Sequence, residues 1–188
     1  MHGFILSDLE RFVATALGAP AWREVLHDAE LGDRAYVASS SYPDHELRDI
    51  VVAAARRTGV GVDRVLFDFG RYLAPDLVRN YRHLLQPEWR TLDVVEHTEL
   101  LLHRVAMPGD PHASVPHLTV SRDENGVSIA YRSRLGLCAL ARGAVVGLAD
   151  CFHEHISVRE PLCVQRGARA CTLQVRDLRS TDQHIPAL

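Results

Sequence analysis

The sequence predicts an α+β fold, in which a helical N-terminal two thirds precedes a small antiparallel sheet with a packed helix. Three observations lead to this prediction. Apolar residues recur at helical spacing from Ile5 to about Met107, apolar and polar residues alternate after Pro116, and a further helical stretch separates two pairs of alternating segments. We expect residues 1–180 to form one domain and residues 181–188 to form a tail.

The first three helices are indicated by apolar spacing and by capping residues. Apolar residues between Ile5 and Leu17 fall on one helix face. Pro20 can open a second helix, because proline is favoured in the first turn. Asp44 is the expected N-cap of a third helix, which should end near Gly59.

Two further helices are expected before the sheet. One should run from Val62 to Leu73 and be broken by Pro75, because proline lacks the N–H that a helix interior needs. The other should be a single long helix over residues 92–107, with Thr91 as its N-cap and Pro108 after its end.

The C-terminal part alternates like a sheet. The turn at residues 123–126 predicts a hairpin. A helix over residues 136–152 should follow it and pack on the sheet. The four predicted strands cover residues 117–121, 127–131, 156–158 and 171–175.

Composition excludes several classes of function. The chain has 188 residues and a formal net charge of −3, so it lacks the positive field that a general nucleic-acid binder needs. No apolar run is long enough to span a membrane, and the first residues lack the features of a signal peptide. We therefore expect a cytoplasmic protein whose thiols stay reduced. A phosphate-binding glycine loop, a nucleophile elbow and a His-Glu-x-x-His motif are all missing, so we do not expect an enzyme.

The cysteine spacing predicts a metal site. Glu160 precedes Cys163 by three residues, and Cys171 follows eight residues later, beyond Gly167. Cys138 can join them from the start of its helix. Thiolates and a carboxylate are suitable ligands for tetrahedral zinc, so the site is expected to be structural or redox-sensitive.

Other assignments of the same residues stay open. The cysteines can instead be small core residues and unpaired thiols. Cys151 lies within an apolar helix and is expected in the core. His153 and His155 can replace Glu160 as the fourth ligand.

The order of several motifs resembles that of the heme nitric oxide/oxygen-binding (H-NOX, or HNOB) family. His103 lies on the expected long helix, Pro116 follows thirteen residues later, and Tyr131-Arg-Ser133 ends a strand. The start Met-His-Gly and the segment 69–72, Phe-Gly-Arg-Tyr, are also similar to that family, as is Ile-Ser-Val at 156–158.

The resemblance implies a heme b group with His103 as its axial ligand. Pro116 would pack against the heme, and Tyr131 and Ser133 would bind its propionates. The family's motif has an arginine two residues after the serine. Here that position is Leu135, and Arg134 is the neighbouring candidate. A one-residue shift reverses the face of a strand, so Arg134 requires a bend in the chain.

The axial ligand has an alternative. His97 lies six residues before His103, on a different face of the expected helix. An alignment through the turn at Pro108 would instead place Leu100 at the ligand position. We prefer His103, because its spacing to Pro116 fits the family.

The resemblance also implies a signal and a partner. Oxygen-binding members use a distal tyrosine to donate a hydrogen bond to dioxygen, and the matching position here is Leu140. Ile5 and Leu9 would complete the pocket, and none of these three side chains can donate. Nitric oxide or carbon monoxide is therefore the expected ligand. The expected partner is a histidine kinase or a cyclic-dinucleotide enzyme.

The cysteine region is similar to the zinc site of 4-vinyl reductase-type effector domains. That likeness implies two alternative functions on the same fold. One is a heme-free effector domain that binds a small apolar ligand, and the other is a zinc/thiol redox switch.

Overall fold

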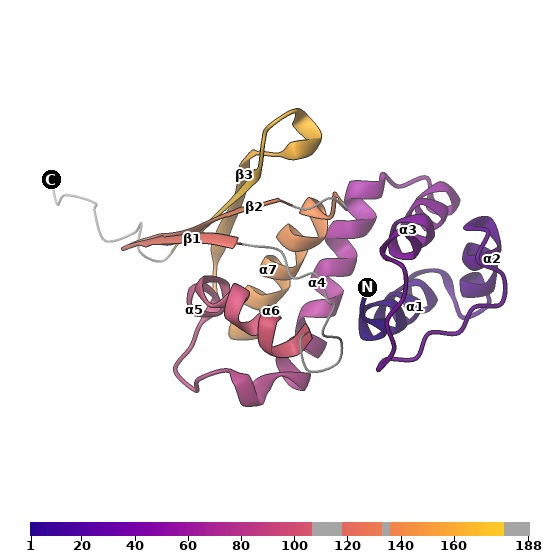
Figure 1. Ribbon diagram of the computed structural model, residues 1–188, viewed down its shortest axis with the longest axis horizontal. Helices are drawn as coiled ribbons and strands as arrows, with labels where there is room; N and C mark the ends of the chain where they lie inside the picture. The colour runs from indigo at the N-terminus through magenta and orange to yellow at the C-terminus, as the bar shows by residue number, and fades with distance from the viewer. Residues whose placement is uncertain (107–117, 133–135, 179–188) are drawn as a thin grey trace, which may run out of the picture.

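The computed structural model describes residues 1–106, 118–132 and 136–178, except for the side chains of residues 103, 105 and 106. Its helices precede its sheet, as the α+β prediction requires, and one late helix packs on the sheet (Figure 1). The helices are α1 (Gly3–Leu17), α2 (Ala21–Asp28), α3 (Asp44–Thr58), α4 (Val62–Asn80), α5 (Thr91–Glu96), α6 (Thr98–Ala106) and α7 (Cys138–Phe152), with short 3-10 turns η1 (Arg82–Leu84) and η2 (Val164–Arg166).

The sheet has four antiparallel strands in the order β1-β2-β4-β3. They are β1 (Leu118–Asp123), β2 (Gly126–Tyr131), β3 (Ile156–Leu162) and β4 (Cys171–Asp177). The two predicted strand pairs are confirmed. Their fusion into one sheet comes from the pairing of β2 with β4, two segments that are about 40 residues apart in the sequence.

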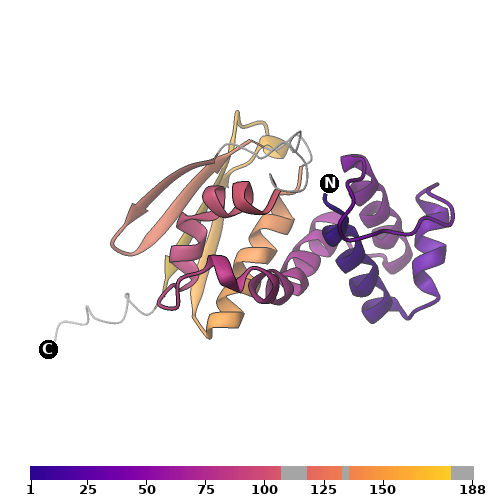
Figure 2. The same cartoon turned by 60° about the horizontal axis from the view of Figure 1, so that its bottom comes forward.

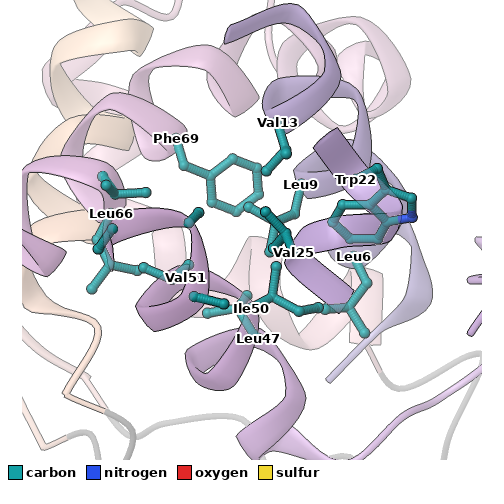
Figure 3. Close-up of a cluster of buried hydrophobic side chains, with 14 of the residues drawn as sticks. Leu6, Leu9, Val13, Trp22, Val25, Leu47, Ile50, Val51, Leu66 and Phe69 are labelled. Carbon is teal, nitrogen blue, oxygen red and sulfur yellow. The ribbon is translucent and has the colours of Figure 1, made fainter. Parts of the chain in front are cut away.

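The described residues form two main hydrophobic clusters. The first is the helical lobe, in which α1 to α4 bury side chains such as Leu9, Ile50 and Phe69 (Figure 3). The second lies between the sheet, α5 and α7, and includes Val127, Leu173 and Val175. Burial of such side chains is the main favourable term in folding.

Helices α4 and α7 join the two clusters, and they lie side by side in both views (Figures 1 and 2). Glycines make this close approach possible. A Cβ atom on Gly143 would lie 1.9 Å from the carbonyl oxygen of Phe67, and one on Gly70 would lie 2.2 Å from that of Leu140. The contact fixes the position of the start of α7 relative to both hydrophobic clusters.

Two helix predictions were wrong. Pro75 lies inside α4, which continues to Asn80. Leu73 and Ala74 are buried and Leu77 packs on the same cluster, so tertiary packing offsets the lost hydrogen bond, a penalty of about 3 kcal/mol in an isolated helix. Burial on both sides of a proline cannot be seen in local propensity.

The predicted long helix is two helices, α5 and α6, that meet at His97. The ring of His97 stacks on Trp89 with 4.4 Å between ring centroids, and its Nδ1 donates to the carbonyl of Asp93 at 2.8 Å. These contacts hold the break in place.

The cap residues also differ from the expectation. The N-caps are Pro43 for α3 and Arg90 for α5, one residue before the predicted Asp44 and Thr91. The third helix ends at Gly59, as expected, and this glycine adopts the left-handed conformation. In the described part of the chain, no helix is long and apolar enough to cross a membrane.

Candidate functional site

Four of the predicted ligands meet at one end of the sheet. Cys138 is the first residue of α7, and Cys171 is the first residue of β4. Glu160 lies in β3, where the register with β4 is irregular between Arg159 and Leu162. Cys163 follows β3 directly. Alternation along β3 places Glu160 on the same face as Ile156 and Val158, which pack on the core, and the irregular register lies between Glu160's neighbour Arg159 and Leu162, just before Cys163.

The turn between the two strands is held by its own backbone. The N–H groups of Arg166 and Ala168 both donate to the carbonyl of Cys163, at 3.0 and 3.1 Å. Gly167 adopts a left-handed conformation with φ of 87°, which favours glycine. The side chain of Gln165 donates to the carbonyl of Gly136 at 2.7 Å and so ties this turn to the segment before α7. The cysteine ligands are thus positioned by three separate pieces of chain.

The distances within the cluster fit a tetrahedral metal ion. The Sγ atom of Cys138 lies 3.1 Å from that of Cys171 and 3.7 Å from that of Cys163, and the last two are 4.0 Å apart. A tetrahedral zinc with Zn–S bonds of about 2.3 Å requires sulfur atoms about 3.8 Å apart. The four ligand atoms, including a Glu160 oxygen, lie within 4.8 Å of one another. In the part of the chain that the structure describes, this is the one such group of three or more candidate ligands.

The three cysteines of the cluster are buried thiols. Cys138, Cys163 and Cys171 are all buried and free of disulfides. Burial, and then the neighbouring thiol of Cys171, raises the pKa of the Cys138 thiol well above its usual range. A divalent cation is the charge that would stabilise a thiolate here.

The carboxylate of Glu160 is divided between the cluster and an arginine. Its side chain is 3% exposed, and Oε2 lies 3.3 Å from Nη1 of Arg166. Oε1 is buried and has no hydrogen-bond partner. A buried carboxylate oxygen without a partner is costly, and a metal ion would satisfy it. The N–H of Val164 also donates to the sulfur of Cys171 at 3.4 Å. These residues fit zinc.

The other candidate ligands lie outside the cluster. Cys151 is half-buried near the C-terminal end of α7, and burial raises the pKa of its thiol. His153 ends α7 in a left-handed conformation, and neither it nor His155 belongs to the group of four.

The predicted gas pocket residues lie together in the helical lobe. Leu9 is fully buried in its core, and Ile5 and Leu140 are partly buried against it. Leu140 is placed there by the close packing of α7 on α4 at Gly70. The three predicted gas-pocket side chains are therefore apolar and contact the same hydrophobic cluster.

Several predicted heme contacts cannot be placed. His103 belongs to α6, but its side chain lies outside the described residues, as do Pro116, Ser133 and Arg134. The alternative His97 is engaged by Trp89 and Asp93. Leu100 on α6 is 45% exposed.

Tyr131 lies at the thiol cluster, a position that its predicted heme role did not suggest. It ends β2, pairs with Cys171 of β4 and packs on the three cysteines. Its hydroxyl is buried and has no hydrogen-bond partner. Burial, and then the nearby sulfur of Cys138, raises the pKa of this hydroxyl well above its usual value.

Two features of the site were missed in the sequence. Arg166 contacts Glu160 across the turn, and Tyr131 approaches the cysteines through strand pairing. The first contact joins a strand residue to the 3-10 turn after it, and alternation along a strand does not reveal such a contact. The second could have been found from the alternation of β2, which places Tyr131 on the same face as Val127 and Ile129.

Comparison with family models gives a match to one family. The haem-NO-binding model (HNOB) matches residues 2–160, which is most of the chain. The chain belongs to the haem-NO-binding family. This confirms the H-NOX resemblance, whereas the likeness of the cysteine region to 4-vinyl reductase-type domains finds no support in the comparisons.

Solved structures of H-NOX proteins share the fold. An H-NOX protein from S. oneidensis in the Fe(II)NO ligation state is 27% identical, with a TM-score of 0.86 over 94% of this chain and 99% of that one. The NMR structure of the H-NOX domain from Shewanella oneidensis in the Fe(II)CO ligation state is 27% identical, with a TM-score of 0.83 over 94% of this chain and 98% of that one. An I5F mutant of T. tengcongensis H-NOX is 17% identical, with a TM-score of 0.82 over 95% and 98%, and shows the fold alone. No curated protein sequence matches significantly.

Proposed function

We propose that this haem-NO-binding protein is a heme-based sensor of nitric oxide that signals to a separate partner protein. The observation that carries the proposal is the match of the family model over residues 2–160. The similarity to an S. oneidensis H-NOX protein in the Fe(II)NO ligation state supports the choice of gas. The apolar wall at Ile5 and Leu140 supports a porphyrin on this side of the helical lobe.

The proposed roles of the heme contacts follow the family resemblance. His103 on α6 would hold the iron as a neutral imidazole. Pro116 would pack against the ring, and Tyr131, Ser133 and Arg134 would bind the propionates by hydrogen bonds and charge. When bound, heme supplies an iron centre that takes up a diatomic gas.

The pocket side chains would set the gas selectivity. Bound dioxygen carries partial negative charge and is stabilised by a hydrogen-bond donor, whereas nitric oxide and carbon monoxide need one much less. Ile5, Leu9 and Leu140 have no donor. We therefore expect the ferrous protein to bind nitric oxide and carbon monoxide and to form no stable oxygen complex. A long-lived ferrous-oxy spectrum in air would contradict this selectivity.

The thiol cluster would hold one zinc ion through Cys138, Cys163 and Cys171, with Glu160 as the fourth ligand. The protein would work in the cytoplasm, where these thiols stay reduced. An oxidant such as hydrogen peroxide removes two electrons from two thiolates, which then form a disulfide and release the metal. The site can in this way act as a redox sensor at the start of α7.

The signal would be transmitted by a change in how the helical lobe packs against the rest of the domain. Strain at His103 would move α6 relative to the helical lobe, giving two states that a partner can distinguish. From the family resemblance we propose a histidine kinase or a cyclic-dinucleotide enzyme as that partner, and neither nucleic acid nor a membrane.

The test of the ligand is a glycine substitution with chemical rescue. His103→Gly should abolish heme binding, and added imidazole should restore it by refilling the place of the side chain. His97→Gly is the matched control, because it removes a histidine two turns earlier and should leave the heme absorption spectrum unchanged. The reverse pattern would assign the ligand to His97.

A heme-free zinc/thiol switch is the second candidate function. Two observations favour it: the hydroxyl of Tyr131 is buried at the thiol cluster, and position 135 is Leu where the family motif has arginine. A heme-free domain that binds a small apolar ligand is a variant of this alternative. A colourless protein that retains zinc when supplied with heme would support it over the sensor of nitric oxide.

A further inference from the structure

The side chain of Tyr131 points from the end of β2 into the thiol cluster. Val127, Ile129 and Tyr131 occupy alternate positions of β2, and the first two are buried in the cluster of the sheet. Tyr131 is partly buried, and it packs on Cys138, Cys163 and Cys171. Its Cα pairs with that of Cys171, so the strand pairing itself sets its place.

The hydroxyl of Tyr131 lacks the partner that a buried polar group needs. It is one of five described side-chain polar atoms that are buried without a hydrogen bond. Leaving such a group unpaired is unfavourable, because it loses its hydrogen bonds to water without gaining others. A phenylalanine ring would pack on the cysteines equally well, so packing alone does not explain the hydroxyl.

The acceptor next to this hydroxyl is the sulfur of Cys138. Tyr131 packs on Cys138, and the nearby sulfur raises the pKa of its hydroxyl, although the two groups are not placed in a hydrogen bond. A neutral thiol is a weak acceptor, whereas a thiolate is a strong one, because a hydrogen bond to an ionised acceptor is roughly twice as strong as a neutral one. The hydroxyl therefore gains a strong acceptor when a bound metal ion displaces the proton of the thiol.

We infer that Tyr131 is a positioning residue of the thiol site, whose hydroxyl donates a hydrogen bond to the sulfur of Cys138 when that sulfur binds a metal as a thiolate. The inference rests on the zinc site of the proposed function. A phenol has one proton to donate, so the sulfur of Cys138 and a heme propionate would compete for the hydroxyl of Tyr131. Such outer hydrogen bonds orient ligands, and their loss typically lowers metal affinity 10–100-fold.

The experiment compares zinc affinity in two phenylalanine variants. Tyr131→Phe should bind zinc roughly tenfold or more weakly than the unmodified protein in competition with a chromophoric chelator. Tyr72→Phe is the matched control, because Tyr72 packs in the helical lobe against Phe12, and its loss should leave zinc affinity unchanged. Equal affinity in Tyr131→Phe and the unmodified protein would overturn the inference and leave the zinc site intact. Absence of zinc binding in the unmodified protein would overturn both.

Cobalt(II) gives a readout that a purely structural role would not change. A hydrogen bond to a thiolate stabilises its lone pairs, so the sulfur-to-cobalt charge-transfer band should move to lower energy in Tyr131→Phe and stay in place in Tyr72→Phe. An unmoved band in Tyr131→Phe would contradict the inference.

A measurement on the unmodified chain covers the case in which Tyr131→Phe does not fold. With tyrosine labelled at 13Cζ, one of the five tyrosine signals should shift when zinc is added, because Tyr131 is the described tyrosine that packs on the cluster. If no tyrosine signal moves while zinc binds, the hydroxyl does not donate to the site.

Discussion

The thiol site and the proposed heme site differ in how their residues are spaced along the chain. Three of the four thiol-site ligands lie between residues 160 and 171, on one pair of strands and their turn. The proposed heme site extends from Ile5 to Leu140 and needs α1, α6 and α7 together. A site built on a hairpin can be specified locally, whereas a cofactor site between lobes depends on the packing of the whole fold.

The two sites also differ in the chemical character of their residues. The thiol cluster has buried sulfur atoms and an unpaired carboxylate oxygen, which favour a cation, and beside them an unpaired hydroxyl that can donate to a thiolate. The predicted gas-pocket residues Ile5, Leu9 and Leu140 are instead apolar and contact the core of the helical lobe. Tyr131 is a residue for which both sites have a proposed role, so changes there affect the comparison directly.

The largest expected effect is the loss of a zinc ligand. Cys163→Ala or Cys171→Ala should remove zinc from the purified protein, because three remaining ligands with one vacant corner bind far more weakly. Elemental analysis without added metal should give about one zinc per unmodified chain. Cys151→Ala is the matched control and should keep its zinc, since this residue lies outside the cluster. Zinc that survived both ligand substitutions would remove the site from the account.

Acid should release the metal from the thiol site. The pKa of the Cys138 thiol is raised by burial, so protons compete with the metal for its sulfur even near neutral pH. Zinc affinity should therefore fall as the pH falls, by roughly tenfold per pH unit for each proton that binding displaces. A chelator titration at several pH values measures this slope. The range from about pH 6 to 8 lies below the raised pKa of the Cys138 thiol, so protons compete with the metal throughout it. A flat profile over this range would show that the cysteines are not the ligands.

The packing of α7 on α4 should respond to a single methyl group. Gly143→Ala places a Cβ where the carbonyl of Phe67 stands, and overpacking of this kind costs roughly 1–3 kcal/mol of unfolding free energy. Gly61→Ala is the control at an open position before α4, where we expect a loss of less than about 1 kcal/mol. Denaturant unfolding of both variants gives the comparison. Equal stability of the two would mean that α4 and α7 do not pack this closely.

The smallest expected effect concerns Arg166. Its side chain is 56% exposed, so the ion pair with Glu160 is screened by water and contributes at most about 1 kcal/mol. Arg166→Ala should therefore change zinc affinity only several-fold. Glu160→Gln should weaken zinc binding more strongly, because it removes the charge of the ligand itself. A loss in Arg166→Ala as large as that in Glu160→Gln would show that the arginine is essential to the site.

The thiol site could be predicted more completely than the heme site. The spacing of Glu160, Cys163 and Cys171 indicated the ligand set, because a tight turn brings neighbouring strand ends together. Arg166 and Tyr131 were missed, since their contacts depend on the path of the turn after β3 and on the pairing of β2 with β4.

The helices show where local patterns stop being sufficient. The apolar stripe of α1 is set by spacing alone and was predicted correctly. Pro75 remains in α4 because residues on both sides of it pack in the core. The break at His97 depends on the stacking of its ring on Trp89, which spacing alone does not reveal.

The central claim is that this haem-NO-binding chain holds a heme through His103 and takes up nitric oxide. The most direct measurement is the absorption spectrum of the ferrous protein, purified with heme supplied, before and after addition of nitric oxide. The account predicts a Soret band that shifts when the gas is added, and its loss in His103→Gly with recovery in imidazole. A protein that stays colourless with heme supplied, or a Soret band that persists in His103→Gly without imidazole, would contradict it.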